Sequence, residues 1–124
     1  MEIRKELDGR ILVREQTFEV FDEHLITICL FKMPGQTFLL WVGNQQTDSG
    51  KLTNLCLAIN GHSTNVIGNE ENSVLVNNLS IRLSEKFNGK APTYLSYNLK
   101  GAAYSSKQFI IKVEELVNEF LSRA

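Results

Sequence analysis

Two neighbouring segments of this chain have the length of β-strands but no polar side. They are residues 25–31 (LITICLF) and 38–42 (FLLWV). Successive side chains of a strand point to opposite faces of its sheet, so the apolar residues of each segment fall on both faces. The second segment contains two such sets: Phe38, Leu40 and Val42 on one face, and Leu39 and Trp41 on the other. Both faces of the predicted sheet must therefore be kept from water.

The chain as a whole has the composition of one globular domain. Its 124 residues are predicted to form a single domain, residues 1–124, that buries about two-thirds of its unfolded surface. The net charge of −1 argues against a nucleic-acid partner, and no apolar run has the length of a membrane span. The charged N-terminus, MEIRKELDGR, predicts no secretory signal. We therefore expect a cytoplasmic protein, with the nucleus left open as a further location.

The first part of the chain is predicted to be an antiparallel β-meander. Residues 24–33 and 37–43 are strands joined by Pro34–Gly35, which suit the two central positions of a type II turn. Residues 10–21 also alternate, but their apolar phase shifts along the segment, which predicts a bulge or a bent edge strand. Further strands are expected at residues 52–60, 63–67 and 91–99.

Two segments in the second half have helical periodicity. Apolar residues recur at three- and four-residue steps across residues 75–87 and, more regularly, across residues 109–121. Two helices of about 10 Å diameter cover approximately one face of such a sheet. The predicted fold class is therefore α+β: an antiparallel sheet of five to six strands with two amphipathic helices on one face.

The uncovered face predicts a partner. Left exposed, it would be a far larger apolar patch than a soluble monomer usually shows, so we expect sheet-to-sheet dimerisation through this face. The candidate interface residues are the two alternative sets, Phe38, Leu40 and Val42, or Leu39 and Trp41. The pattern does not decide which set lies beneath the helices. Two other arrangements stay open: one helix on each face, or long loops that fill the gap.

The residues that usually carry chemistry form no convincing arrangement. His62 precedes Ser63, but neighbours in an extended segment point to opposite faces, and the chain lacks the G-x-S-x-G turn of serine hydrolases. Cys29 and Cys56 lie in apolar strand patterns, without a second thiol at metal-ligand spacing. We therefore predict a protein that is not an enzyme, with no catalytic, cofactor-binding or metal-binding residue. A small hydrolase using Ser63 and His62 is the catalytic alternative.

Several short motifs, taken in order, resemble one family. The motifs are FLLWVG (38–43), NLCLAI (54–59), VIGN (66–69), LSIRLSEKFNGK (79–90) and YLSYNL (94–99), followed by the amphipathic terminal helix. Over roughly residues 10–122 the chain is similar to the proteasome assembly chaperone 4 family. The resemblance implies an antiparallel sheet with helices on one side, which pairs sheet to sheet with a related chaperone. The two-sided apolar segments independently predict the same arrangement.

The resemblance also implies a non-enzymatic function. A heterodimer with a subunit like proteasome assembly chaperone 3 would bind α-type subunits of the 20S proteasome core, promote assembly of their ring, and leave before the particle matures. From expected exposure alone, the candidate α-subunit contacts are Gln45, Gln46, His62, Asn65, Lys100 and Tyr104. The alternative function is a longin- or roadblock-like trafficking or scaffold adaptor, which also dimerises through a sheet.

Overall fold

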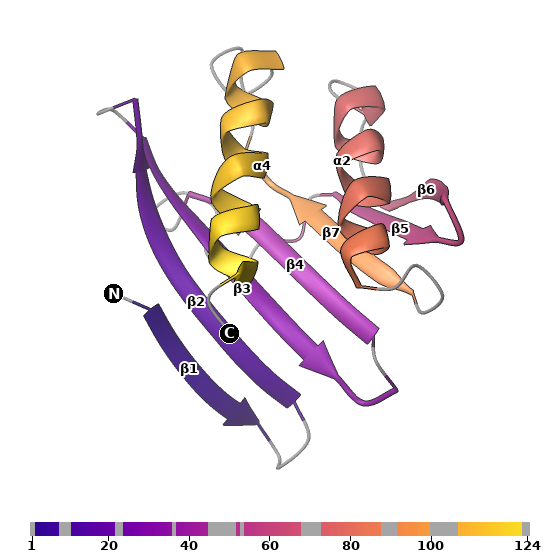
Figure 1. Ribbon diagram of the computed structural model, residues 1–124, viewed down its shortest axis with the longest axis horizontal. Coiled ribbons are helices and arrows are strands. Elements are labelled where there is room, and N and C mark those ends of the chain that lie inside the picture. Colours follow the sequence, from indigo (N-terminus) through magenta and orange to yellow (C-terminus); the bar gives the residue numbers. More distant parts are fainter. Residues whose placement is uncertain are drawn as a thin grey trace.

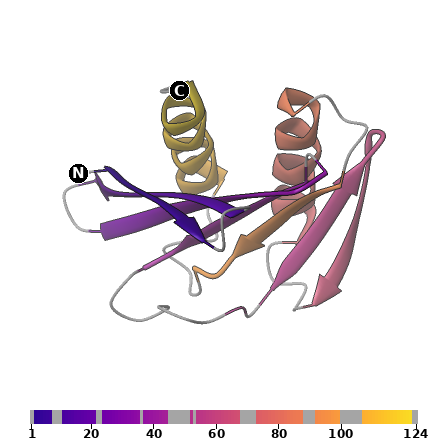
Figure 2. The same ribbon diagram turned by 90° about the horizontal axis from the view of Figure 1, so that it is seen from below.

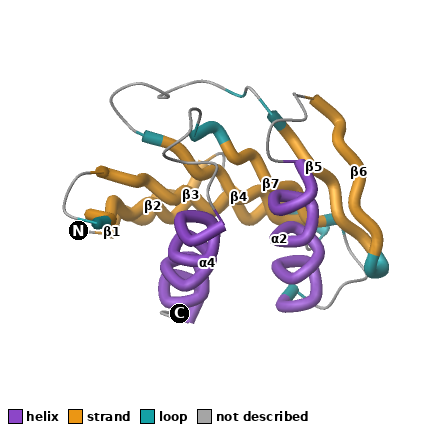
Figure 3. Tube along the Cα trace, turned by 90° about the horizontal axis from the view of Figure 1, so that it is seen from above, coloured by secondary structure: helices purple, strands orange, loops and turns teal. Residues whose placement is uncertain are grey.

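The computed structural model shows one β-sheet with two helices, α2 (Ser73–Lys86) and α4 (Lys107–Ser122), packed against it (Figure 1). It describes residues 2–7, 11–21, 24–35, 37–44, 52, 54–67, 73–87, 92–99 and 107–122, with only the backbone for residues 2–7 and 73–75. Both helices lie on the same side of the sheet when the sheet is seen edge-on (Figures 2 and 3). Neither helix is long and apolar enough to cross a membrane.

The N-terminal part forms an antiparallel meander. Its four strands are β1 (Glu2–Leu7), β2 (Ile11–Val20), β3 (His24–Met33) and β4 (Thr37–Gly43). Pro34 and Gly35 form the turn between β3 and β4, and the φ of 80° at Gly35 is the positive value that the second central position of a type II turn requires. The left-handed glycine expected from the sequence is confirmed.

Three shorter strands complete the sheet. β5 (Leu55–Ile59) and β6 (His62–Ile67) form a hairpin, and β7 (Thr93–Tyr97) lies between β4 and β5, giving the order β1-β2-β3-β4-β7-β5-β6. β7 is antiparallel to β5 but parallel to β4. Parallel neighbours need a long crossover connection, and here that connection contains β5, β6 and α2.

The predicted α+β class is confirmed, and both helices cover one face. The sheet, however, has seven strands instead of five to six, and one strand pair is parallel. The additional strand is β1, whose sequence EIRKEL has four charged residues and therefore no apolar alternation that would reveal it. The parallel pair depends on a contact between strands far apart in the sequence, which alternation within each strand does not encode.

The bulge expected within residues 10–21 does not occur in β2. The strand pairs residue by residue with β3 from Leu12 to Val20, with no shift of register. Its apolar phase changes because the two ends serve different faces of the sheet. Val13 lies on the face away from the helices, whereas Phe18 and Val20 belong to the core on the helix side.

The hydrophobic core lies between the sheet and the two helices. α4 contributes a regular stripe of buried side chains, as its periodicity predicts: Phe109, Ile110, Val113, Leu116, Val117 and Phe120. The strands supply the opposing layer, which includes Ile26, Ile28, Leu30, Leu40, Val42, Leu95 and Tyr97. α2 closes the other end of this layer with Val76, Leu79 and Leu83.

Arg14 attaches β2 to the C-terminal end of α4. Its Nη2 donates a hydrogen bond of 2.7 Å to the carbonyl oxygen of Phe120, and its guanidinium carbon lies 4.4 Å from the centroid of the Phe120 ring. A cation is favourable both at the negative end of a helix dipole and over an aromatic ring. These contacts hold the last turns of α4 over β2.

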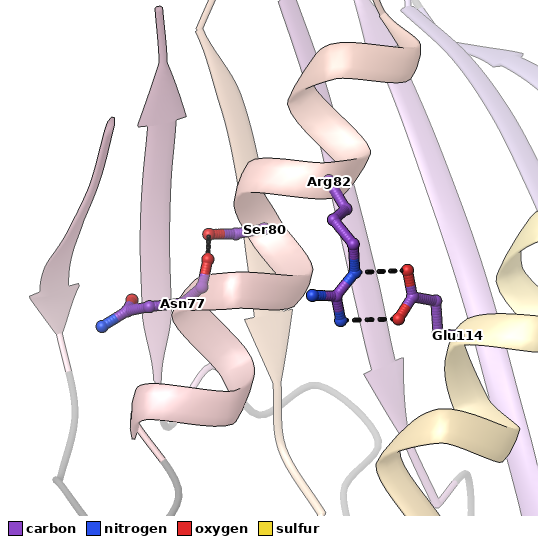
Figure 4. Close-up of polar contacts among 4 residues, drawn as sticks. All are labelled: Asn77, Ser80, Arg82 and Glu114. Carbon is purple, nitrogen blue, oxygen red and sulfur yellow. Dashed lines mark hydrogen bonds and ion pairs between the residues drawn. The ribbon is translucent and has the colours of Figure 1, made fainter. Parts of the chain in front are cut away.

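An ion pair joins the two helices to each other. Nε and Nη2 of Arg82 each donate a hydrogen bond of 2.6 Å to the carboxylate of Glu114 (Figure 4). The Arg82 side chain is 47% exposed, and such exposed pairs typically contribute about 0.2–1 kcal/mol to stability. The pair therefore sets the spacing of the helices, whereas packing on the sheet supplies most of the stability.

We predict that Phe120→Ala strongly destabilises the fold. Phe120 is fully buried and supports Arg14, so its truncation should lower the free energy of unfolding by about 3–5 kcal/mol. Ile111→Ala is the control on the same helix, because Ile111 is 46% exposed and should change this free energy by about 0.5 kcal/mol or less. Urea denaturation followed by circular dichroism measures both. Similar effects of the two substitutions would contradict the placement of α4.

Candidate functional site: the open face of the sheet

The sheet face opposite α2 and α4, called the open face below, carries a continuous row of apolar side chains. Strand register places Val13, Phe31, Leu39, Tyr94 and Leu57 side by side across β2, β3, β4, β7 and β5. All five are half-buried, and no described helix or strand lies over them (Figure 2). Five strands at about 4.8 Å spacing make this apolar row roughly 20 Å long.

The structure decides which apolar set of β4 lies beneath the helices. Leu40 and Val42 are fully buried in the core, and Phe38 is on the same side, stacked on Phe87 with ring centroids 4.0 Å apart. Leu39 and Trp41 point to the open face. Only this second set therefore faces away from the helices, which the sequence could not decide because both sets are apolar.

Trp41 lies flat along the open face because the next residue on that face is Gly43. A Cβ atom at Gly43 would lie 2.5 Å from Cη2 and 2.8 Å from Cζ2 of the Trp41 ring. Such distances are far below van der Waals contact, so any side chain at this position would displace the indole. Register places Glu15, Cys29 and Ser96 beside Trp41 in the second row of this face.

A buried polar network fixes the ends of the parallel strands β4 and β7. Asn98 donates two hydrogen bonds in this network. Its backbone N–H donates to the Val42 carbonyl at 2.8 Å, and its side-chain Nδ2 donates to Ser96 Oγ at 2.9 Å. Ser96 Oγ donates in turn to the Asn54 carbonyl at 2.7 Å. Since β4 and β7 run in the same direction, the segments that follow them leave the sheet at the same end.

Four of the predicted α-subunit contacts belong to the segments that follow β4 and β7 in the sequence. Gln45 and Gln46 follow β4 in sequence, and Lys100 and Tyr104 follow β7. All four lie outside the described residues, so their assignment stays a prediction. The parallel pairing of β4 and β7, which alternation did not predict, is what brings the starts of these two segments together.

The other two predicted contacts, His62 and Asn65, lie on the exposed edge strand β6. His62 follows the Asn60–Gly61 turn at the opposite end of the sheet from Asn98, because β5 runs antiparallel to β7. Both side chains are exposed. His62 therefore lies at the other end of the sheet from Asn44 and Asn98, the described residues that follow β4 and β7.

The predicted hydrolase pair is not formed. Ser63 points to the helix side, where its Oγ lies 2.8 Å from Ser80 Oγ and donates a hydrogen bond of 3.0 Å to Asn77 Oδ1. Ser80 in turn donates to the Asn77 carbonyl at 2.7 Å (Figure 4). His62 pairs with Ile59 on the opposite face of the strand. Ser63 therefore anchors β6 to α2 and has no histidine base.

The two thiols are held in their neutral form. Burial, with a smaller effect of the Glu15 carboxylate, raises the pKa of Cys29 to about 12, and burial also raises the pKa of Cys56. Cys56 Sγ–H donates to Asn65 Oδ1 at 3.2 Å. Within the described residues, no group of three or more histidine, cysteine or acidic side chains is placed to hold a metal ion.

Comparison with solved structures finds the same fold in a chain of the crystal structure of a chaperone complex for yeast 20S proteasome assembly. The TM-score is 0.59 at 13% sequence identity, and the match covers 89% of this chain and 95% of that chain. At this identity the similarity shows a shared fold. Neither a protein-family model nor the sequence of a curated protein matches the chain.

We predict that Gly43→Ala moves Trp41 out of its position on the open face. Because Trp41 is the single tryptophan of the chain, its fluorescence emission should shift in this variant while circular dichroism stays close to that of the wild type. Gly35→Ala is the control for the emission: nothing lies within 4 Å of a Cβ atom there, so the strain from its φ of 80° should lower stability without moving Trp41. Unchanged emission in Gly43→Ala would contradict the contact between the ring and the glycine.

We also predict slow alkylation of Cys29 in the folded protein. With its pKa raised from 9.0 to about 12, the thiolate fraction at pH 8 is roughly a thousandth of that of an unperturbed thiol. The rate should rise about tenfold per pH unit up to that pKa, because only the thiolate reacts. Iodoacetamide labelling of a Cys56→Ser variant, with and without urea, measures this. Equal rates in the two conditions would contradict the burial of Cys29.

Proposed function

We propose that this chain is a proteasome assembly chaperone subunit that acts by binding proteins. In this proposal its open face pairs with a related small subunit, similar to proteasome assembly chaperone 3. The resulting heterodimer binds α-type subunits of the 20S proteasome core in the cytoplasm, promotes assembly of their ring and then dissociates. No catalytic step and no cofactor is part of this function.

The observation that carries the proposal is the apolar row on the open face. Apolar patches of a few hundred Å² are the largest that most soluble monomers expose, and a standard interface buries about 800 Å² on each partner. A second sheet laid on the open face would cover Phe31, Leu39 and Trp41 together. The shared fold with a chain of a yeast assembly-chaperone complex supports the same interpretation.

Release from the finished particle needs no energy source in this proposal. The heterodimer binds a free or partly assembled α-type subunit through a surface that a later subunit must occupy. The incoming subunit then displaces the chaperone by competition, because the two cannot bind together. Binding through exposed edges and chain segments is compatible with such exchange.

We predict opposite effects for charges on the two sides of β4. Leu39→Asp and Trp41→Asp should abolish pairing with the small subunit but leave a soluble folded chain. Leu40→Asp and Val42→Asp should unfold the chain, because an unpaired carboxylate in the core costs several kcal/mol out of a total stability of about 5–15 kcal/mol. Size-exclusion chromatography with light scattering reports pairing, and circular dichroism reports folding.

Ile111→Asp on the outer side of α4 is the matched control and should affect neither property. If the open-face variants still pair with the small subunit, the interface lies elsewhere. A wild-type chain that stays monomeric and well folded at micromolar concentration in the presence of its candidate partner would also contradict the proposal.

Affinity purification at native level separates this function from an adaptor role. Co-purification of proteasome α-type subunits with one small partner supports the chaperone. Co-purification of GTPases or coat proteins would instead favour a longin- or roadblock-like adaptor, which also dimerises through a sheet.

A further inference from the structure

The two edges of the sheet differ in how they are protected. At one edge, β1 has the sequence EIRKEL, in which four of six residues are charged. At the other edge, β6 has the sequence HSTNVI, with no aspartate, glutamate, lysine or arginine. Charged side chains on an edge strand discourage pairing with a further strand. The β6 edge (Figure 3) lacks this protection.

The backbone of β6 presents hydrogen-bonding groups to the outside. Asn60 and Gly61 have φ values of 52° and 79°, which are those of a two-residue type I′ hairpin loop. In such a hairpin the residues flanking the loop form a hydrogen-bonded pair, and the two kinds of pair then alternate. Ser63 and Asn65 consequently occupy the positions whose backbone N–H and C=O groups point away from β5. The register shift in this hairpin lies beyond Asn65, next to Leu55.

The inner side of the β6 edge is already fixed. Ser63 is bonded to Asn77 and Ser80 of α2 at 3.0 and 2.8 Å, and Asn65 accepts a hydrogen bond from Cys56 of β5 at 3.2 Å. A strand held in its extended conformation loses little conformational freedom when another segment pairs with it. The β6 edge is therefore organised for binding before any partner arrives.

Two apolar side chains follow Asn65, at the register shift where the regular pairing of β6 with β5 is interrupted. Val66 is 52% exposed and Ile67 is 46% exposed. Both are β-branched residues, which are usually at least half-buried in strands. They add apolar contact area next to the outward backbone groups. Together these features are those of an edge that accepts an added strand.

We infer that the β6 edge binds an extended, uncharged segment of a proteasome α-type subunit by strand addition. This inference rests on the proposed function, in which the small subunit covers the open face. It specifies how Asn65, expected as an α-subunit contact from exposure alone, would take part: through its backbone. His62, also expected from exposure, pairs with Ile59 next to the hairpin loop, so its backbone groups point towards β5. Only an extended backbone can satisfy a row of outward N–H and C=O groups.

A second copy of this chain fits the β6 edge less well. Pairing of β6 with β6 of a second copy would bring the α2 helices of the two copies towards each other on one side of the joined sheet. The described α2 residues that bond to β6 are Asn77 and Ser80, which are both polar. Little apolar surface would be buried between the helices.

The test uses the purified heterodimer of this chain with its small subunit and each purified α-type subunit. Asn65→Pro removes an outward N–H but none of the ladder bonds to β5, and proline is tolerated at such edge positions. We expect it to weaken binding of the α-type subunit at least tenfold, while pairing with the small subunit is retained. Asn65→Ala keeps the N–H and is the matched control, with affinity within about threefold of the wild type.

Two further measurements keep the outcome clear. Val66→Lys places a charge beside the edge at an exposed position that cannot disturb the core, and it should also weaken binding of the α-type subunit. This variant provides the test if Asn65→Pro folds poorly. Amide hydrogen exchange should show protection of Ser63 and Asn65 when the α-type subunit binds, which contact between side chains alone would not produce.

The alternative results separate the inference from the function on which it rests. Unchanged affinity in Asn65→Pro and Val66→Lys, without new protection, would overturn strand addition and leave the chaperone function standing. Failure of the wild-type heterodimer to bind any α-type subunit would overturn both. Self-association of the wild type that Asn65→Pro abolishes would identify a second copy as the occupant and reject this inference.

Discussion

The structure depends on a sheet that is apolar on both faces while helices cover only one of them. The strand register shows this difference between the two faces, because neighbouring apolar residues of β4 point to opposite faces of the sheet. Leu40 is sealed in the core, whereas Leu39 continues a row of half-buried side chains across five strands. Hydrophobic stabilisation scales with the area removed from water, so in the proposed function a partner laid on the open face would gain free energy from covering this row.

The contacts that attach the two helices lie on the covered side of the sheet. α4 is held at its C-terminal end by Arg14 of β2, and α2 is held by the contacts of Ser80 and Asn77 with β6. The Arg82–Glu114 pair then fixes the distance between the helices. All of these contacts lie on one side of the sheet. The open face has polar contacts of its own, such as the pair of hydroxyls Thr17 Oγ1 and Thr27 Oγ1 at 2.8 Å, but none of them attaches α2 or α4. Gly43 allows Trp41 to lie along this face.

The sequence predicted the parts of this fold that local periodicity encodes. Alternation identified β2, apolar runs of strand length on either side of Pro34–Gly35 identified β3 and β4, and helical stripes identified α2 and α4. β1 was missed because charged residues such as Arg4 hide its alternation. The parallel position of β7 and the choice between Leu39 and Leu40 depend on contacts between distant segments, which periodicity does not record. That the helices leave one apolar face uncovered was predicted, but which residues of β4 lie on that face required the structure.

The two surfaces to which we assign partners differ in physical character, and this difference suits a chaperone. Pairing through the open face would bury large side chains such as Phe31 and Trp41, and interfaces of this kind dissociate slowly. Strand addition at β6 relies on backbone hydrogen bonds, each of which contributes only about 0.5–1.5 kcal/mol net in water. A competing subunit could replace those bonds one after another. A durable heterodimer would thus remain intact while its contact with an α-type subunit is exchanged.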